Sequence, residues 1–159
     1  MTAPHPNTQR VTAAAADAGL TVEVQRFPGG TRTAADAASA VGCEVGAIAK
    51  SIVLMSDDGA VLVLTSGGNR VAYDKVAAAL HLTGVRRADA EEARAATGYP
   101  IGGTAPWGHP APLRILCDED LLAYDIVWAA AGTPDTVFPV APDDLVRAAG
   151  AISADVAER

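Results

Sequence analysis

The sequence has few of the residues on which many enzymes depend. Its 159 residues include only three histidines and two cysteines, and neither type shows the spacing of a metal-ligand set. No Gly-x-Ser-x-Gly segment is present, and neither Cys43 nor Cys117 has a basic partner nearby in the sequence. Proteases, Ser-His-Asp hydrolases and metalloenzymes are therefore poor candidates, and we expect no metal and no cofactor.

Long apolar runs and a targeting segment are also missing. No stretch approaches the length of a membrane span, and the N-terminus lacks both the basic and the apolar part of a signal peptide. Two cysteines far apart in the sequence are typical of reduced thiols in the cytosol. The sequence thus predicts a cytoplasmic protein without a membrane partner.

Positive charge is scarce, since the sequence has 12 basic and 19 acidic residues and therefore a formal net charge of −7. A negative body does not bind a nucleic-acid backbone over a broad surface, so a nucleic-acid partner must meet a small basic patch. Arg86 and Arg87, together with Arg70 and Lys75, are one source of such a patch, although paired arginines more often form a solvated face. Half of the residues are hydrophobic and 19% are charged, which favours one globular domain over residues 1–159.

Apolar periodicity and turn residues predict interleaved helices and strands. The segment 56–59, Ser-Asp-Asp-Gly, indicates a hairpin turn, so the expected fold class is α/β, with a central mixed sheet surrounded by helices. The expected strands are 21–27, 48–55, 60–65, 113–117, 124–130 and 136–140. The expected helices are 7–18, 33–42 (capped by Thr33 and Asp36), 71–81, 89–96 (capped by Asp89 and Glu92), 118–122 and 142–150.

Lys50 is the residue that stands out. It is one of two lysines and falls inside the apolar run 47–55, which reads as a core strand. Lysine is seldom buried without a partner, because its ammonium group loses hydration. An ammonium directed from such a strand into a cleft would bind an anion or a carbonyl group. The alternative is a lysine at the end of the strand, with its stem on apolar surface and its head in water.

Two loops could supply further polar groups. The segment 97–108 holds four glycines and two prolines, and glycine lets main-chain amides approach a ligand and form an oxyanion site. The alternative is a long structural turn. In the segment 131–136, Asp135 could orient a substrate amine or a water, although aspartate after proline more often makes a turn. Trp107 and Trp128 could stack a base or wall a pocket, but core packing is the commoner role.

Four segments, taken in order, resemble the YbaK/ProRS-associated domain family of aminoacyl-tRNA deacylases. They are residues 47–54, residues 66–71 leading to Lys75, residues 97–108, and residues 131–138. The resemblance implies an α/β fold with a central, curved mixed sheet. It also implies hydrolysis in trans of the ester that joins a wrong amino acid to tRNA, and the expected substrate is tRNA(Pro) carrying a small amino acid.

The resemblance also implies which residues form the site. Lys50 matches the key lysine of the family and would bind either the phosphate of the terminal nucleotide or the ester oxygens. Gly102 and Gly103 match its substrate loop, and their amides would face the ester carbonyl. The turn Gly132–Asp135 matches a pocket loop in which alanine-clearing members carry a histidine; here it offers Asp135 instead. The expected site is catalytic Lys50 with substrate-binding Gly102, Gly103, Thr104, Gly132 and Asp135.

The expected partners are the acceptor end of mischarged tRNA and prolyl-tRNA synthetase. A chemical point supports this reading, because an aminoacyl ester is already activated and needs no catalytic dyad: holding the ester and stabilising the oxyanion is sufficient. The alternative is a non-catalytic binding module that uses the same cleft for a nucleotide, an amino acid or a protein partner.

Overall fold

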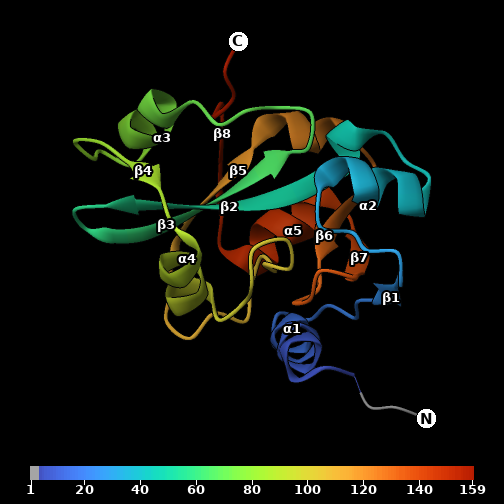
Figure 1. The fold of residues 1–159 in the computed structure, drawn as a ribbon. Coiled ribbons are helices and arrows are strands. Elements are labelled where there is room, and N and C mark those ends of the chain that lie inside the picture. Colours follow the sequence, from blue (N-terminus) through green and yellow to red (C-terminus); the bar gives the residue numbers. More distant parts are fainter. Residues whose placement is uncertain (1–3) are drawn as a thin grey trace.

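The computed structural model describes residues 4–159, which form one mixed sheet with helices on both faces (Figure 1). The strand order is β1-β7-β6-β2-β3-β5-β8, and β4 pairs with β2. The strands are β1 (Gln25–Arg26), β2 (Ile48–Ser56), β3 (Gly59–Ser66), β4 (Arg86–Arg87), β5 (Arg114–Asp118), β6 (Val127–Ala130), β7 (Thr136–Val140) and β8 (Ile152–Ala154). The helices are α1 (Pro6–Asp17), α2 (Ala34–Val41), α3 (Tyr73–Ala79), α4 (Ala90–Thr97) and α5 (Pro142–Ala149), with 3-10 helices η1 (Val45–Ala47) and η2 (Glu119–Ala123).

The central hairpin of β2 and β3 positions the site. Its predicted turn is confirmed, since Ser56 pairs with Gly59. The other edge of β2 is shared by two strands: β6 runs parallel to it at residues 48–49, and β4 runs antiparallel to it at residues 54–55. Residues 50–52 of β2 therefore have no strand neighbour on that edge within residues 4–159. The sheet is open at this point, and Lys50 lies there.

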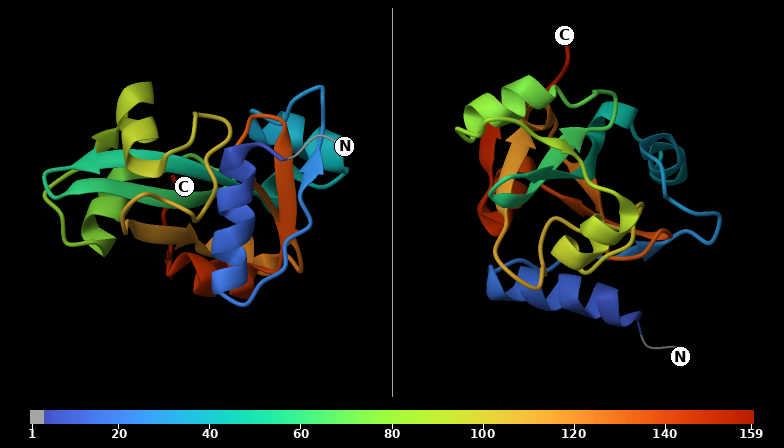
Figure 2. Two further views of the ribbon diagram at one scale, coloured as in Figure 1. Left: turned by 90° about the horizontal axis from the view of Figure 1, so that it is seen from below. Right: turned by 60° about the vertical axis from the view of Figure 1, so that its left-hand side comes forward.

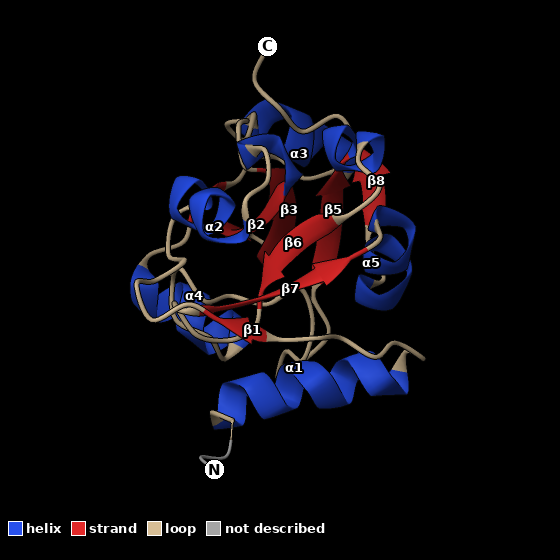
Figure 3. Cartoon of the chain, turned by 90° about the vertical axis from the view of Figure 1, so that its right-hand side faces the viewer, coloured by secondary structure: helices blue, strands red, loops and turns tan. Residues whose placement is uncertain are grey.

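Alternation along the strands buries both faces of the sheet. Leu62 and Leu64 of β3 lie in the larger core, to which α1, α4 and α5 contribute. Val61 and Val63, one residue out of phase, lie in a second core under α3, and α2 packs on Ile48. Figure 2 shows α1 and α3 on opposite sides of the sheet, and Figure 3 shows α2 and α5 on either side of the strands. The period of two residues is the one expected for a doubly covered sheet.

The helices α2 and α4 begin at the capping residues that the sequence predicts. The Thr33 hydroxyl accepts the Asp36 N–H at 3.0 Å, and α2 ends at Gly42 with a left-handed φ of 77°. Asp89 and Glu92 form the predicted capping box, in which each side chain accepts the other's backbone N–H. Such caps each stabilise a helix by about 1 kcal/mol.

Several predicted bounds were wrong. The strand predicted at 21–27 is reduced to β1, because only Gln25 and Arg26 pair with β7, while Val22 and Val24 pack on the core without a strand partner. The strand predicted at 124–130 begins at Val127, since η2 extends to Ala123. A longer first strand was expected because apolar and polar residues alternate through 21–27.

The helix predicted at 71–81 begins at Tyr73. The residues before it are extended, because Val71 forms a bridge with Ala157 and Ala72 donates its N–H to the Val156 carbonyl at 2.7 Å. The last residues of the chain thus lie beside the start of α3. This pairing forms one wall of the cleft described next.

Candidate functional site

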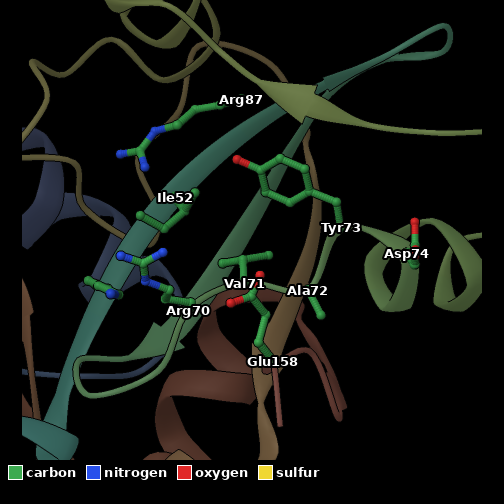
Figure 4. Close-up of a pocket in the computed structure, with 9 residues that line it drawn as sticks. Ile52, Arg70, Val71, Ala72, Tyr73, Asp74, Arg87 and Glu158 are labelled. Carbon is green, nitrogen blue, oxygen red and sulfur yellow. The ribbon is translucent and has the colours of Figure 1, made fainter.

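A cleft of about 810 Å³ opens over the part of β2 that lacks a strand neighbour (Figure 4). It combines three cations, two acids, an aromatic ring and aliphatic side chains. Its lining residues are Lys50, Ile52, Arg70, Val71, Ala72, Tyr73, Asp74, Arg87 and Glu158.

Lys50 is half-buried in this cleft. It lies opposite Thr65 in the β2–β3 register, and its side chain makes no salt bridge or hydrogen bond to the residues that the structure describes. Burial, followed by repulsion from Arg87 and Arg70, lowers the pKa of Lys50 below its ordinary value. A partly desolvated ammonium without a salt-bridge partner among the described residues is available for an anion or a polarised oxygen.

Arg70 is presented by a loop that a buried carboxylate holds in place. Asp118, at the end of β5, is fully buried. It accepts the Ser66 N–H at 3.0 Å, an Asn69 amide N–H at 2.9 Å and the Asp120 N–H at 3.0 Å. These charge-assisted bonds fix the loop 66–69, and Arg70 follows it directly.

Of the four residues considered for a basic patch from the sequence, two line the cleft and two do not. Arg70 and Arg87 do line the cleft with Lys50. Arg86 instead pairs with Glu92 at 2.6 Å, and Lys75 pairs with Asp155 at 2.8 Å. The side chains of neighbouring residues on a strand point to opposite faces, and this separates Arg86 from Arg87.

The two glycines of the substrate loop are not equivalent. The Gly103 N–H donates to the Pro100 carbonyl at 3.0 Å, and the Thr104 hydroxyl donates to the same oxygen at 3.1 Å. The expectation that both glycine amides face a substrate carbonyl is therefore wrong for Gly103. The Gly102 amide has no acceptor among residues 4–159 and is the one available donor of the pair.

The main chain of the glycine-rich segment 97–108 closely approaches the main chain of the turn 131–136. A Cβ on Gly103 would lie 2.7 Å from the carbonyl carbon of Thr133 and 2.8 Å from its Cα. Gly132 has a left-handed φ of 98°, and a Cβ there would meet Asn7 at 2.8 Å. Asn7 also donates to the Gly132 carbonyl at 3.0 Å. Only glycine allows these three segments to approach so closely.

Asp135 is occupied by structural contacts. Its carboxylate accepts Arg26 Nε at 2.9 Å and the Thr133 hydroxyl at 2.7 Å. These bonds, that of Arg26 first, hold the pKa of Asp135 below its ordinary value. Its backbone carbonyl also accepts the Phe27 N–H at 2.7 Å. The geometry favours the structural reading of Asp135 as a turn residue.

The structure brings the predicted site residues together as two neighbouring groups. Gly102, Gly103, Thr104, Gly132 and Asp135 belong to the contacting loops, whereas Lys50 lies in the cleft. A small cavity of about 30 Å³ adjoins the cleft and shares Ile52 and Arg87 with it. Its lining residues are Ser51, Ile52, Val53, Arg87, Ala88, Ala93, Ile101 and Thr104. Both groups therefore flank the same open stretch of β2.

The tryptophans serve the fold. Trp107 is buried in the larger core and donates its indole N–H to the Val11 carbonyl at 3.0 Å, and Trp128 packs beside α2. Within residues 4–159, no group of three or more His, Cys, Asp or Glu side chains is arranged to hold a metal ion. No helix in the described range is long and apolar enough to cross a membrane.

Comparison with known proteins decides the family. Residues 29–148 match the family described as "Aminoacyl-tRNA editing domain". This chain belongs to the aminoacyl-tRNA editing domain family. The resemblance seen in the sequence and the predicted fold class are thereby confirmed, and membership favours the predicted deacylase over a non-catalytic module.

Relatives of this editing domain occur alone and inside larger enzymes. It is 43% identical, with a TM-score of 0.92, to a crystal structure described as a candidate trans-editing enzyme for prolyl-tRNA synthetase, over 99% of this chain and 100% of that one. It is 32% identical over 116 residues, 73% of its length, to a proline–tRNA ligase of Acidithiobacillus ferrooxidans, but it spans only 20% of that ligase. The uncharacterized protein YwhH of Bacillus subtilis is 24% identical over 77% of this chain and 78% of its own length.

Sequence reasoning gave no role to three residues that line the editing-domain cleft or the cavity beside it. Tyr73 was assigned to a helix without a role, and its ring faces the cleft (Figure 4). Glu158 reaches the cleft only because the tail pairs with Val71, which no local signal indicates. Ser51 lines the adjoining cavity, and its buried hydroxyl has no partner among the described residues.

Proposed function

We propose that this chain hydrolyses, in trans, the ester of mischarged tRNA, with tRNA(Pro) carrying a small wrong amino acid as its substrate. The observation that carries the proposal is Lys50. It is a half-buried ammonium without a carboxylate partner in the described structure, and it lies inside the segment that matches the editing domain.

Hydrolysis of an aminoacyl ester requires few catalytic groups from the protein. The attacking water adds to the ester carbonyl, and the tetrahedral intermediate expels the ribose oxygen, which takes up a proton. Lys50 would stabilise the negative charge that develops on the ester oxygens, with the Gly102 amide as a second donor. Removing one such donor typically costs about 100- to 1,000-fold in rate.

The partner and the setting follow from the same reading. The acidic body, of net charge −7, favours contact with the acceptor end alone, through the cationic cleft. Prolyl-tRNA synthetase is the inferred protein partner, because proline–tRNA ligases contain segments similar to this chain. A cytoplasmic location follows, since tRNA is charged there.

The test is a deacylation assay on a panel of mischarged tRNAs that includes alanyl- and cysteinyl-tRNA(Pro). We expect turnover by the natural chain, and a loss of about 100-fold or more in Lys50→Ala. Lys50→Arg should not restore activity, because a wide, planar guanidinium does not replace a compact ammonium in a cleft. The control is Arg94→Ala, which removes an exposed cation outside the cleft lining.

Two outcomes would count against the proposal. Full activity in Lys50→Ala would remove Lys50 from the mechanism. Saturable binding of tRNA without turnover of any charged form would indicate the non-catalytic binding module instead.

A further inference from the structure

The cations of this chain divide into paired and unpaired groups. Of the 12 basic residues, seven donate to a carboxylate, a side-chain amide or a main-chain carbonyl: Arg10, Arg26, Lys75, Arg86, Arg114, Arg147 and Arg159. The remaining five make no such contact within residues 4–159. They are Lys50, Arg32, Arg70, Arg87 and Arg94.

Three of these five unpaired cations line one cleft: Lys50, Arg70 and Arg87. The chain carries 19 acidic residues, so partners are abundant elsewhere, and yet no carboxylate lies within salt-bridge distance of these three in the described structure. The cleft does contain Asp74 and Glu158, but neither pairs with them. Three like charges repel one another and destabilise the fold unless an anion enters.

The cations are spread along the cleft rather than focused on one point. Arg87 lies on β4 opposite Leu54, four residues along β2 from Lys50, which is about 13 Å at the strand rise. Arg70 comes from a separate loop, and Figure 4 shows the guanidinium groups of Arg70 and Arg87 reaching over β2 from two sides, with Ile52 between them. An anion with several charges in line fits such a row of cations.

Besides the cations, the cleft offers aromatic and aliphatic side chains. Tyr73 is 38% exposed, and its ring stands beside Ile52 and Val71 (Figure 4). Aromatic rings beside a basic groove are the usual platform for unpaired bases, whereas arginine forks suit the phosphates between them. The combination is typical of sites for single-stranded nucleic acid.

We infer that Arg70 and Arg87 bind the phosphates that precede the terminal nucleotide of tRNA, while Tyr73 stacks on one of the unpaired bases. The inference rests on the proposed function and extends it: the substrate is the ester together with at least two nucleotides before it. Arg70 and Arg87 are then positioning residues. With the phosphates held by arginine, Lys50 remains available for the ester.

The experiment uses alanyl esters of increasing length: of adenosine, of a cytidine-adenosine dinucleotide with one internal phosphate, and of a cytidine-cytidine-adenosine trinucleotide with two. For the natural chain, kcat/KM should rise with each phosphate. In Arg70→Gln and Arg87→Gln, the ratio of kcat/KM for the trinucleotide ester to that for the adenosine ester should fall by about tenfold, the value of one charge-assisted bond. The matched control is Arg86→Gln, since Arg86 neighbours Arg87 in the sequence but pairs with Glu92 outside the cleft.

A binding measurement needs no turnover. A 5′-phosphorylated, uncharged cytidine-cytidine-adenosine trinucleotide is titrated at several salt concentrations, and the shifts of backbone amide signals are followed by NMR. The slope of log K against log salt should decrease in magnitude by about 0.7 in each arginine variant, and Tyr73→Ala should weaken binding while leaving the slope unchanged.

An unchanged length ratio in both arginine variants, or absence of trinucleotide binding at millimolar concentration, would overturn the inference. Neither result touches the proposed function, which stands or falls on turnover of charged tRNA. Conversely, salt-dependent trinucleotide binding without any ester hydrolysis would support the cleft assignment and refute the deacylase.

Discussion

Replacing Gly103 by alanine perturbs the contact between the two loops of the site at one atom. The new Cβ would lie 2.7 Å from the carbonyl carbon of Thr133, against 3.4 Å for an ordinary contact. The turn 131–136 must therefore retreat by about 0.7 Å, the difference between these two distances. Because both loops are buried main chain here, this overpacking should lower the free energy of unfolding by about 1–3 kcal/mol. A shift of this size can also cost up to about 100-fold in rate.

The assay combines urea denaturation with deacylation of a mischarged tRNA. The controls are Gly29→Ala and Gly84→Ala, since a Cβ at either position meets nothing within 4 Å and neither backbone has a left-handed φ; both should stay within about 0.5 kcal/mol of the natural chain. A Gly103→Ala variant that matched these controls in stability and in rate would show that the close approach of the two loops limits neither.

Three further predictions concern charge and burial. Lys50→Met should raise the melting temperature at neutral pH while abolishing turnover; because the folded-state pKa of Lys50 is lowered, the charged lysine opposes folding below that pKa, and the gain should shrink as pH rises through it. Asp118→Asn should lower the free energy of unfolding by about 1–3 kcal/mol, because the NH2 group of the new side chain would point at N–H groups that now donate to the carboxylate. Urea titration measures this change. In native protein at pH 8, Cys43 should react with a thiol reagent and Cys117 should not, because Cys117 is fully buried and burial raises its pKa to about 12; equal labelling would contradict this.

The features that the sequence predicts well are those decided locally. Thr33 with Asp36, and Asp89 with Glu92, cap their helices as the spacing indicates, because a cap involves residues three positions apart. The hairpin at 56–59 forms for the same reason. By contrast, β4 and β8 contain two and three residues, too few for a periodic pattern, and they exist only because β2 and β5 offer them an edge.

The features of the site likewise divide into those that the local sequence indicates and those that depend on tertiary contacts. Lys50 could be singled out, because a charge inside an apolar run is visible in the sequence, and the structure places it in the cleft; its catalytic role stays a prediction. The choice between Arg86 and Arg87 could not, since it depends on which residue pairs with Leu54 across the sheet. The Gly103 amide was assigned to the substrate because a glycine-rich loop does not reveal which of its N–H groups close a turn.

The pairing of β2 with β6 determines when the fold can be completed during synthesis of the chain. Ile48 finds its neighbour Trp128 only 80 residues later, and the turn that touches Gly103 follows β6 directly. Contacts between such distant positions form late and slowly. A nascent polypeptide that has emerged only as far as β5 holds Lys50, but it has neither β6 nor that turn, so editing capacity should arise in one step, only after residues 127–136 have emerged.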